Sequence, residues 1–292
     1  MMDKKNISSE IVKKIKQLEI FTRRLLNGAL VGDSRSAIKG TGFEFDQIRD
    51  YSFGDDIRFI DWKASSRNNK LLLKQYIEER SRTIFLLVDV SQSSIFGSGQ
   101  LSKSSKIIEL ASVLALVAQH GKDQVGLLLF SDQVEAYIPP GNSLNHIHRI
   151  IEMMLTFNPK QTQTDISKAL QYLFSRHKKD AIVFLISDFI DNNVEMYLAQ
   201  AASQYDLIAV RCLDANEKNI PAVGFITVED LETGELVELN LADESLQHFL
   251  ATRLKKQDTL FKQRGIDLID IMPDSKDYIV DMVRFFRRRM MY

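Results

Sequence analysis

The chain has 292 residues, of which 45% are hydrophobic and 26% are charged, and this composition excludes a largely disordered protein. Its 38 Lys and Arg residues nearly balance its 39 Asp and Glu residues, which excludes a general affinity for nucleic acid, and its single cysteine excludes an internal disulfide. No apolar run approaches the roughly 20 residues that cross a bilayer. We therefore expect a cytoplasmic protein without an integral membrane segment.

The first part of the chain predicts a helix, a loop and two strands. Apolar residues recur every three or four positions between residues 8 and 26, which is the spacing of one helix face. Residues 28–42 contain four glycines and few apolar side chains, and they indicate a loop. Strands are expected at Glu44–Tyr51 and Leu71–Ile77, on either side of a charge-dense segment.

After Arg80, apolar runs typical of buried strands alternate with segments of helical spacing. Strands without polar alternation are typical of parallel sheets covered on both faces by helices. Val134–Pro139 follows one strand directly and predicts a hairpin at the sheet edge. The sequence therefore predicts a doubly wound, mostly parallel α/β sheet. The expected strands are Thr83–Val90, Gln124–Phe130, Ala181–Ser187 and Leu207–Cys212, and the expected helices are Lys106–Gln119, Leu144–Leu155, Ile166–Phe174 and Val194–Ala202.

The C-terminal part predicts a hairpin, two helices and one more strand. Thr233-Gly234 is a turn signal between the apolar stretches Val223–Val228 and Glu235–Leu239. A helix near Glu244–Phe261 and a strand at Ile266–Ile271 follow. The last helix is expected from Ser275 to about Arg289, with its arginines facing outward.

Polar side chains follow the predicted strands at the edge where open α/β sheets bind ligands. Asp89, Ser91 and Ser93 are spaced by two residues after the first strand, Asp188 follows a later strand, and Thr164 precedes a helix. Two carboxylates and three hydroxyls form a set of hard oxygen donors, which suits Mg²⁺ or Mn²⁺. The alternative interpretation is that these side chains cap the helices that follow them.

These five residues resemble the metal-ion-dependent adhesion site of von Willebrand factor A domains, whose pattern is Asp-x-Ser-x-Ser, then Thr, then Asp. The resemblance implies a metal held by Asp89, Ser91, Ser93, Thr164 and Asp188, with one position open for a carboxylate from a protein partner. The family usually has glycines before its Thr, where this chain has Gln163. A scaffold with a degenerate metal site is therefore an alternative.

A second resemblance covers nearly the whole chain. Gly42-Phe43-Glu44-Phe45, Arg49-Asp50-Tyr51 and the stretch from Gly54 to Trp62 are similar to the signature of the domain-of-unknown-function 58 family. The resemblance implies an N-terminal signature segment, residues 1–80, before a von Willebrand A-like domain, residues 81–292. It also implies a non-enzymatic partner or adaptor of a MoxR-type AAA+ ATPase in the assembly or maturation of a protein complex.

The charges between Arg49 and Trp62 predict a network of ion pairs around a turn at Gly54. We interpret this network as a clasp that holds the segment to the main domain, with a partner-facing surface as the alternative. Trp62, the only tryptophan, is expected to be an anchor in the core or in this clasp, with a role in stacking on a ligand as the alternative.

Two other activities fit the sequence less well. Gly97 to Ser104 differs from a phosphate-binding Walker A loop by Ser102, which stands where that loop needs its second glycine. A divalent-metal-dependent phosphoester hydrolase would use the same aspartates, but no paired histidine or lysine base accompanies them. We therefore expect a metal-dependent protein-binding function, with the hydrolase as the alternative.

Overall fold

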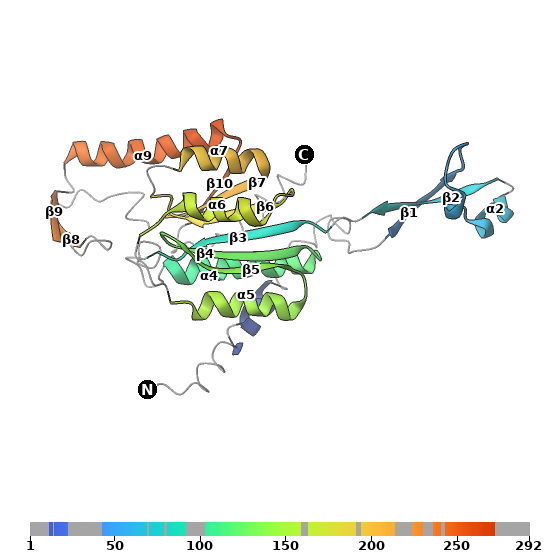
Figure 1. Ribbon diagram of the computed structural model, residues 1–292, viewed down its shortest axis with the longest axis horizontal. Helices are drawn as coiled ribbons and strands as arrows, with labels where there is room; N and C mark the ends of the chain where they lie inside the picture. Colours follow the sequence, from blue (N-terminus) through green and yellow to red (C-terminus); the bar gives the residue numbers. More distant parts are fainter. Residues whose placement is uncertain are drawn as a thin grey trace.

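The computed structural model describes residues 12–13, 15–22, 43–68, 70–78, 81–91, 103–158, 163–190, 194–213, 224–229, 236–240 and 243–271. These residues form an α/β main domain, an arm between residues 43 and 78, and a short β-hairpin (Figure 1). The predicted last helix, Ser275 to Arg289, lies outside the described residues.

A six-stranded sheet with the order β10-β7-β6-β3-β4-β5 forms the centre of the main domain. Its strands pair in parallel, except that β5 runs antiparallel to β4 at one edge. The chain passes from β3 to β4 on one side and later to β6 on the other, so the strand order reverses at β3. This topology confirms the predicted doubly wound, mostly parallel sheet and its hairpin edge. The strands are β3 (Thr83–Asp89), β4 (Gln124–Phe130), β5 (Val134–Gly141), β6 (Ile182–Ser187), β7 (Asp206–Cys212) and β10 (Asp267–Ile271).

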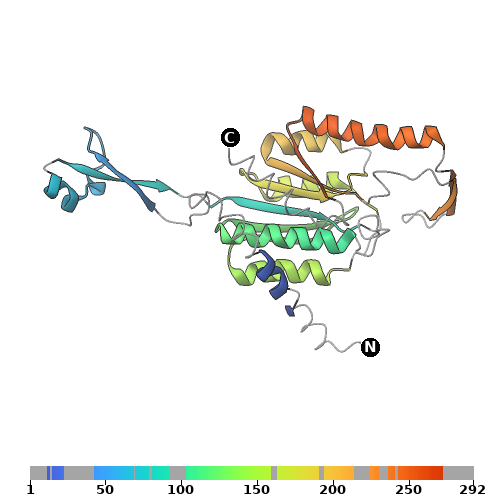
Figure 2. The same cartoon turned by 180° about the vertical axis from the view of Figure 1, so that it is seen from behind.

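Helices cover both faces of this sheet (Figures 1 and 2). In β3, Leu86 and Val88 face the apolar cluster under α4 and α5, whereas Phe85 and Leu87 face the cluster under α6, α7 and α9. Because both faces are buried, both sets of alternating residues are apolar, and the strand becomes one continuous apolar run. The helices are α4 (Lys103–His120), α5 (Leu144–Thr156), α6 (Ile166–Arg176), α7 (Glu195–Gln204) and α9 (Glu244–Gln263).

The N-terminal helix packs against the main domain. Residues 12–13 and 15–22 are helical, and Ile15 and Leu18 join the apolar cluster under α4 and α5. The Glu19 carboxylate lies 2.6 Å from Nε2 of His148 in α5, which attaches the helix to the same layer. The predicted division of the chain after residue 80 stays a prediction.

The arm consists of two antiparallel strands joined by short helical turns. Its elements are β1 (Phe43–Asp50), the 3-10 helix η1 (Ile57–Phe59), α2 (Trp62–Asn68) and β2 (Leu72–Glu78). Ile60 and Leu73 form an isolated bridge and are both buried, and the Leu72 amide donates to the Ser65 hydroxyl at 2.8 Å. The two strands confirm those predicted at Glu44–Tyr51 and Leu71–Ile77, whereas η1 and α2 are not predicted by the sequence pattern.

The ion pairs predicted near Gly54 form inside the arm and do not clasp it to the main domain. Arg49 donates to both carboxylate oxygens of Asp55, at 2.7 and 2.8 Å, and this bonding holds the pKa of that carboxyl below its ordinary value. Arg58 pairs with Asp56. Trp62 is 67% exposed, so its expected position in a core is wrong. Each of these two ion pairs joins residues close in sequence, so it stabilises the turn and does not connect the arm to the main domain.

A second hairpin connects β7 to α9. Strands β8 (Phe225–Glu229) and β9 (Leu236–Asn240) pair antiparallel with Val228 opposite Val237, in agreement with the predicted hairpin. Among the described residues, no helix has the length and apolar character needed to cross a membrane.

Candidate functional site at the carboxyl edge of the sheet

The predicted aspartates meet at the carboxyl edge of two neighbouring strands. Asp89 is the last residue of β3, and Asp188 directly follows β6. The Ser187 hydroxyl donates to Oδ2 of Asp89 at 2.7 Å, which joins the ends of the two strands. Because the strand order reverses at β3, this edge is the position at which doubly wound sheets place their ligands.

The two carboxylates are buried and repel each other. Asp89 and Asp188 are each 2% exposed. Burial, followed by the negative charge of Asp188, raises the pKa of Asp89 to about 6, although hydrogen bonds from Ser187 and Ser91 favour its charged form. Buried like charges of this kind need a compensating positive charge, part of which the nearby buried Lys103 supplies. The edge is therefore electrostatically suited to bind a cation.

Ser91 belongs to the same group, through a turn that follows β3. Its amide donates to Oδ1 of Asp89 at 2.9 Å, and the Asp188 carboxylate accepts from the Ile190 amide at 3.0 Å. The aspartates therefore shape the turns after their own strands. The side chain that caps α6 is Asp165. Ser93 lies outside the described residues.

Thr164 lies at the same edge, on the segment that leads into α6. The Asp165 amide donates to the Ser131 carbonyl at 2.9 Å, which places this segment beside the end of β4. The Thr164 hydroxyl oxygen is buried and, among the described residues, has no hydrogen-bond partner. A buried hydroxyl in this state is unfavourable unless something else binds it. No hydrogen bond joins Thr164 to either aspartate.

The backbone after Asp188 is held in an unusual conformation. Phe189 has a φ of 57°, a left-handed conformation that bulky residues rarely adopt. Its amide donates to the Ser187 hydroxyl at 3.1 Å, and its carbonyl accepts from the Gln257 amide group at 2.8 Å. Its ring packs edge-on against Phe261 of α9. These contacts fix the position of the preceding carboxylate.

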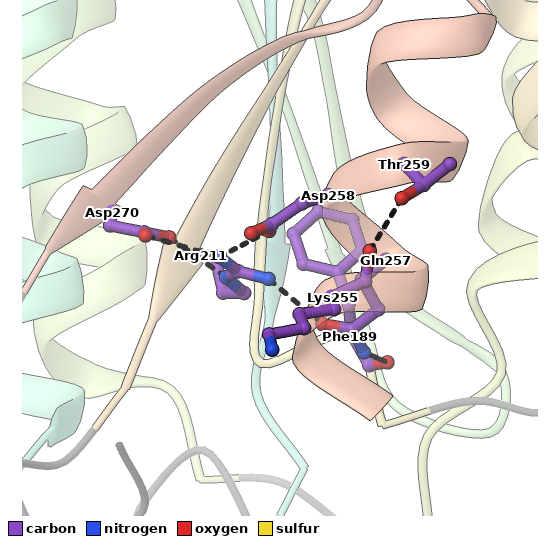
Figure 3. Close-up of polar contacts among 7 residues, drawn as sticks. All are labelled: Phe189, Arg211, Lys255, Gln257, Asp258, Thr259 and Asp270. Atoms are coloured by element: carbon purple, nitrogen blue, oxygen red, sulfur yellow. Dashed lines mark hydrogen bonds and ion pairs between the residues drawn. The ribbon is translucent and has the colours of Figure 1, made fainter. Parts of the chain in front are cut away.

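A buried arginine supports this loop from β7 (Figure 3). Arg211 is opposite Ser187 in the sheet, and its guanidinium donates to both carboxylate oxygens of Asp270, at 2.8 and 3.0 Å. It also lies 2.8 Å from Asp258 and donates to the side-chain amide oxygen Oε1 of Gln257 at 3.1 Å. Arg211 therefore links β7 and β10 to the residue of α9 that holds the Phe189 carbonyl.

The buried Lys103 adds a positive charge to the cluster. It is the first residue of α4 and is 2% exposed. Burial raises the pKa of Cys212 to about 12, the Lys103 charge acts in the opposite direction, and Asp188 and Asp89 raise the pKa further. Lys103 and both aspartates therefore lie close enough to Cys212 for their charges to change its pKa.

Ser187, Arg211 and Lys103 are not among the site residues predicted from the sequence. Arg211 could have been found, because it is a charge inside an otherwise apolar run ending at Cys212. The only sequence signal for a role of Ser187 at the site was its position directly before Asp188. Lys103 was considered only within the Walker-like stretch, most of which lies outside the described residues.

A pocket of about 290 Å³ opens beside Asp89. Its polar lining residues are Asp89, Ser104 and Asn158, and apolar residues of β3, β4, α4 and α5 with Phe157 complete the wall. The carboxylate edge therefore adjoins a mostly apolar cavity large enough for a side chain.

The donor chemistry fits a hard divalent cation. Asp89, Ser91, Asp188 and the unpartnered hydroxyl of Thr164 offer oxygen atoms only, which Mg²⁺ and Mn²⁺ prefer. Among the described residues, no three His, Cys, Asp or Glu side chains gather as a metal-binding group. Any cation at this edge would therefore depend on hydroxyls as well as carboxylates.

Comparison with known proteins places the chain in a family. Uncharacterised proteins from Mycobacterium tuberculosis and Mycobacterium bovis are each 26% identical over 287 residues, covering 96% of this chain and 90% of theirs. Similar solved structures are BatB from Bacteroides thetaiotaomicron (12% identity, 73% of this chain, 100% of that chain, TM-score 0.48) and the SpRpn10 VWA domain (13%, 70%, 95%, 0.41). The family model described as "Protein of unknown function DUF58" matches residues 47–259. The chain therefore belongs to the DUF58 family.

Proposed function

We propose that the chain is a protein-binding module whose carboxyl edge recognises a partner through a divalent cation, Mg²⁺ or Mn²⁺. The observation that carries the proposal is the pair of buried carboxylates, Asp89 and Asp188, which meet at one edge near a buried lysine, Lys103. A divalent cation would add positive charge and further relieve the repulsion between the two carboxylates. The membership of the DUF58 family and the α/β fold support an interaction function in general.

The residues that would hold the cation are those that the sequence predicts. Asp89 and Asp188 supply the negative charge, and Ser91, Ser93 and Thr164 supply neutral oxygens. A bound divalent ion supplies positive charge and an open coordination position for a carboxylate of the partner. The pocket beside Asp89 receives an apolar side chain next to that carboxylate.

The proposed partner, from the family resemblance alone, is a MoxR-type AAA+ ATPase or the complex that it remodels. The proposed role is one of binding without catalysis, in the cytoplasm. Turnover of p-nitrophenyl phosphate with Mg²⁺ or Mn²⁺ that is lost in Asp89→Asn would contradict this role and support the alternative hydrolase.

The first test measures the cation itself. In isothermal titration with MgCl₂ and MnCl₂, Asp89→Asn should weaken binding by about 100-fold or more, because a charged ligand becomes neutral in a buried site. The matched control is Asp180→Asn, because Asp180 is exposed at the opposite end of the sheet, before β6. If the wild-type protein binds neither ion, the site is degenerate.

The second test measures the partner. Purified MoxR-type ATPase from the same cells should bind the wild-type chain and the Asp180→Asn control with MgCl₂, and lose binding with EDTA or with Asp89→Asn. Equal recovery of the ATPase under all four conditions would exclude recognition through a cation.

A further inference from the structure

The arm carries an unusual share of the exposed apolar surface. Six of the twelve exposed large hydrophobic residues of the described chain lie between residues 48 and 71, which we call the arm tip. Phe53 is fully exposed, and Ile57 and Trp62 are 64% and 67% exposed. Single exposed apolar side chains are common on protein surfaces, but several in one short segment mark an interaction site.

The shape of the arm tip is set without using these side chains. Arg49 bonds to Asp55, the Ser52 amide donates to Asp55 at 2.8 Å, and Asp61 accepts from the Ala64 amide at 3.0 Å. These polar contacts hold the turn and the start of α2. Phe53, Ile57 and Trp62 are therefore presented on a preorganised frame, as anchor residues are at protein interfaces.

The part of the arm whose side chains are described, residues 48–68 and 70–74, has few buried side chains, and this also favours a covering partner. Its described buried residues are Ile60, Ser65 and Leu73. A two-stranded hairpin is marginally stable in water unless further strands, helices or partners cover it. A partner that covers the arm tip would bury its exposed apolar side chains and so stabilise the hairpin.

The charges of the arm tip indicate the chemistry of that partner. Lys63, Arg67 and Lys70 are exposed on and beside α2, and among the described residues none of them forms an ion pair. These three cations next to Trp62 complement carboxylates. Asp55 and Asp56, between Phe53 and Ile57, are paired with arginines, and such ion pairs among apolar side chains suit the polar rim of a protein interface but not the hydrocarbon of a lipid surface.

We propose that the arm tip is a docking site for a protein that presents apolar side chains flanked by carboxylates. This surface is separate from the cation edge, because the arm joins β3 at its amino end and Asp89 lies at its carboxyl end. The arm is therefore a second contact, one that does not depend on a divalent cation.

Trp62 makes the test direct, because it is the only tryptophan and lies in the proposed site. A photo-crosslinking amino acid at position 53 of the full chain, in cells that make it, should join one protein that the same probe at Met196 does not. Met196 of α7 is also 67% exposed and is the matched control. The crosslinked protein is then purified and titrated into the wild-type chain with EDTA present, while the Trp62 emission is recorded.

The proposal expects a saturable blue shift of Trp62 and its protection from acrylamide quenching. Phe53→Ser, and the triple variant Lys63→Glu, Arg67→Glu and Lys70→Glu, should each weaken binding at least about tenfold, whereas Met196→Ser should not. Circular dichroism of each variant checks that the fold is retained.

Three results would overturn the proposal. A blue shift with vesicles of phosphatidylglycerol and phosphatidylcholine, but not with the protein, would assign the arm tip to a membrane. A blue shift that grows with the concentration of the chain alone would assign it to self-association. Binding that needs Mg²⁺ and is lost in Asp89→Asn, but is unchanged in the arm variants, would assign the contact to the cation edge.

Discussion

At the scale of single residues, the carboxyl edge is held in place by side chains that are not themselves proposed cation ligands. Ser187 bonds to Asp89, and Gln257 holds the carbonyl of Phe189 directly after Asp188. Arg211 connects these positions to β10 and α9. A ligand site of this kind depends on its supporting residues, because small displacements of a carboxylate weaken its binding to a cation.

Arg211→Met should destabilise the main domain by about 2–3 kcal/mol. The Arg211 side chain is 3% exposed, and its loss leaves Asp270 and Asp258 without their cation, although their partial exposure to water reduces the cost. Urea unfolding followed by circular dichroism measures the change.

Arg58→Met is the control for this substitution, because it removes the same group from an exposed ion pair in the arm. Its unfolding curve should coincide with that of the wild-type chain. Equal curves for Arg211→Met and the wild-type chain would show that the Arg211 network contributes no stability.

At the scale of elements, the sheet depends on a close approach between neighbouring strands. Gly126 in β4 lies against the ring of Phe85 in β3, and a Cβ atom at position 126 would meet Cε1 of that ring at 2.6 Å. Phe85 is fully buried in the cluster under α6, α7 and α9. The absence of a side chain on one strand therefore makes room for an aromatic ring on the next.

Gly126→Ala should lower the free energy of unfolding by about 1–3 kcal/mol, because the added methyl group forces Phe85 out of its packed position. Thermal and urea unfolding measure the change. The control is Gly121→Ala, where the nearest atom to an added Cβ lies at 3.4 Å, and a change within about 0.5 kcal/mol is expected there. Similar losses in the two variants would mean that the contact with Phe85 does not matter.

At the scale of the whole molecule, the arm and the main domain are built on different cores. The main domain buries long apolar runs on both faces of its sheet, whereas the arm buries Ile60 and Leu73 between its own elements. The cation edge and the arm tip belong to these two parts. A variant can therefore remove either proposed contact and leave the other intact.

Replacement of residues 43–78 by a short Gly-Ser linker should leave the main domain folded. We expect its thermal midpoint to stay within a few degrees, because the contacts of β1, β2, η1 and α2 are made largely among themselves. Differential scanning calorimetry measures the midpoint, and titration with MgCl₂ checks that the cation edge is unchanged. A midpoint lower by more than about 10 °C would show that the arm is part of the main core.

The sequence predicted the main sheet, both strands of the arm and the ion pairs around Gly54, but it predicted neither η1 and α2 nor the exposure of Trp62. Thr83–Val90 and Ala181–Ser187 have one stable solution, a strand buried on both faces, and the observed β3 and β6 follow these runs. In the arm, Trp62 was expected to be a core or clasp anchor, because large aromatic side chains are highly buried on average. Its exposure depends on what lies opposite, which local patterning does not contain.

By itself, the sequence determined which segments are strands of a doubly wound sheet, and hence that Asp89 and Asp188 end up at one edge, because parallel strands bring their carboxyl ends together. Only the tertiary structure decided that Arg211 and Gln257 support this edge, that the Thr164 hydroxyl is buried without a partner, and that the arm tip is uncovered. These features arise from residues far apart in the chain, and their contacts exist only after the layers have packed.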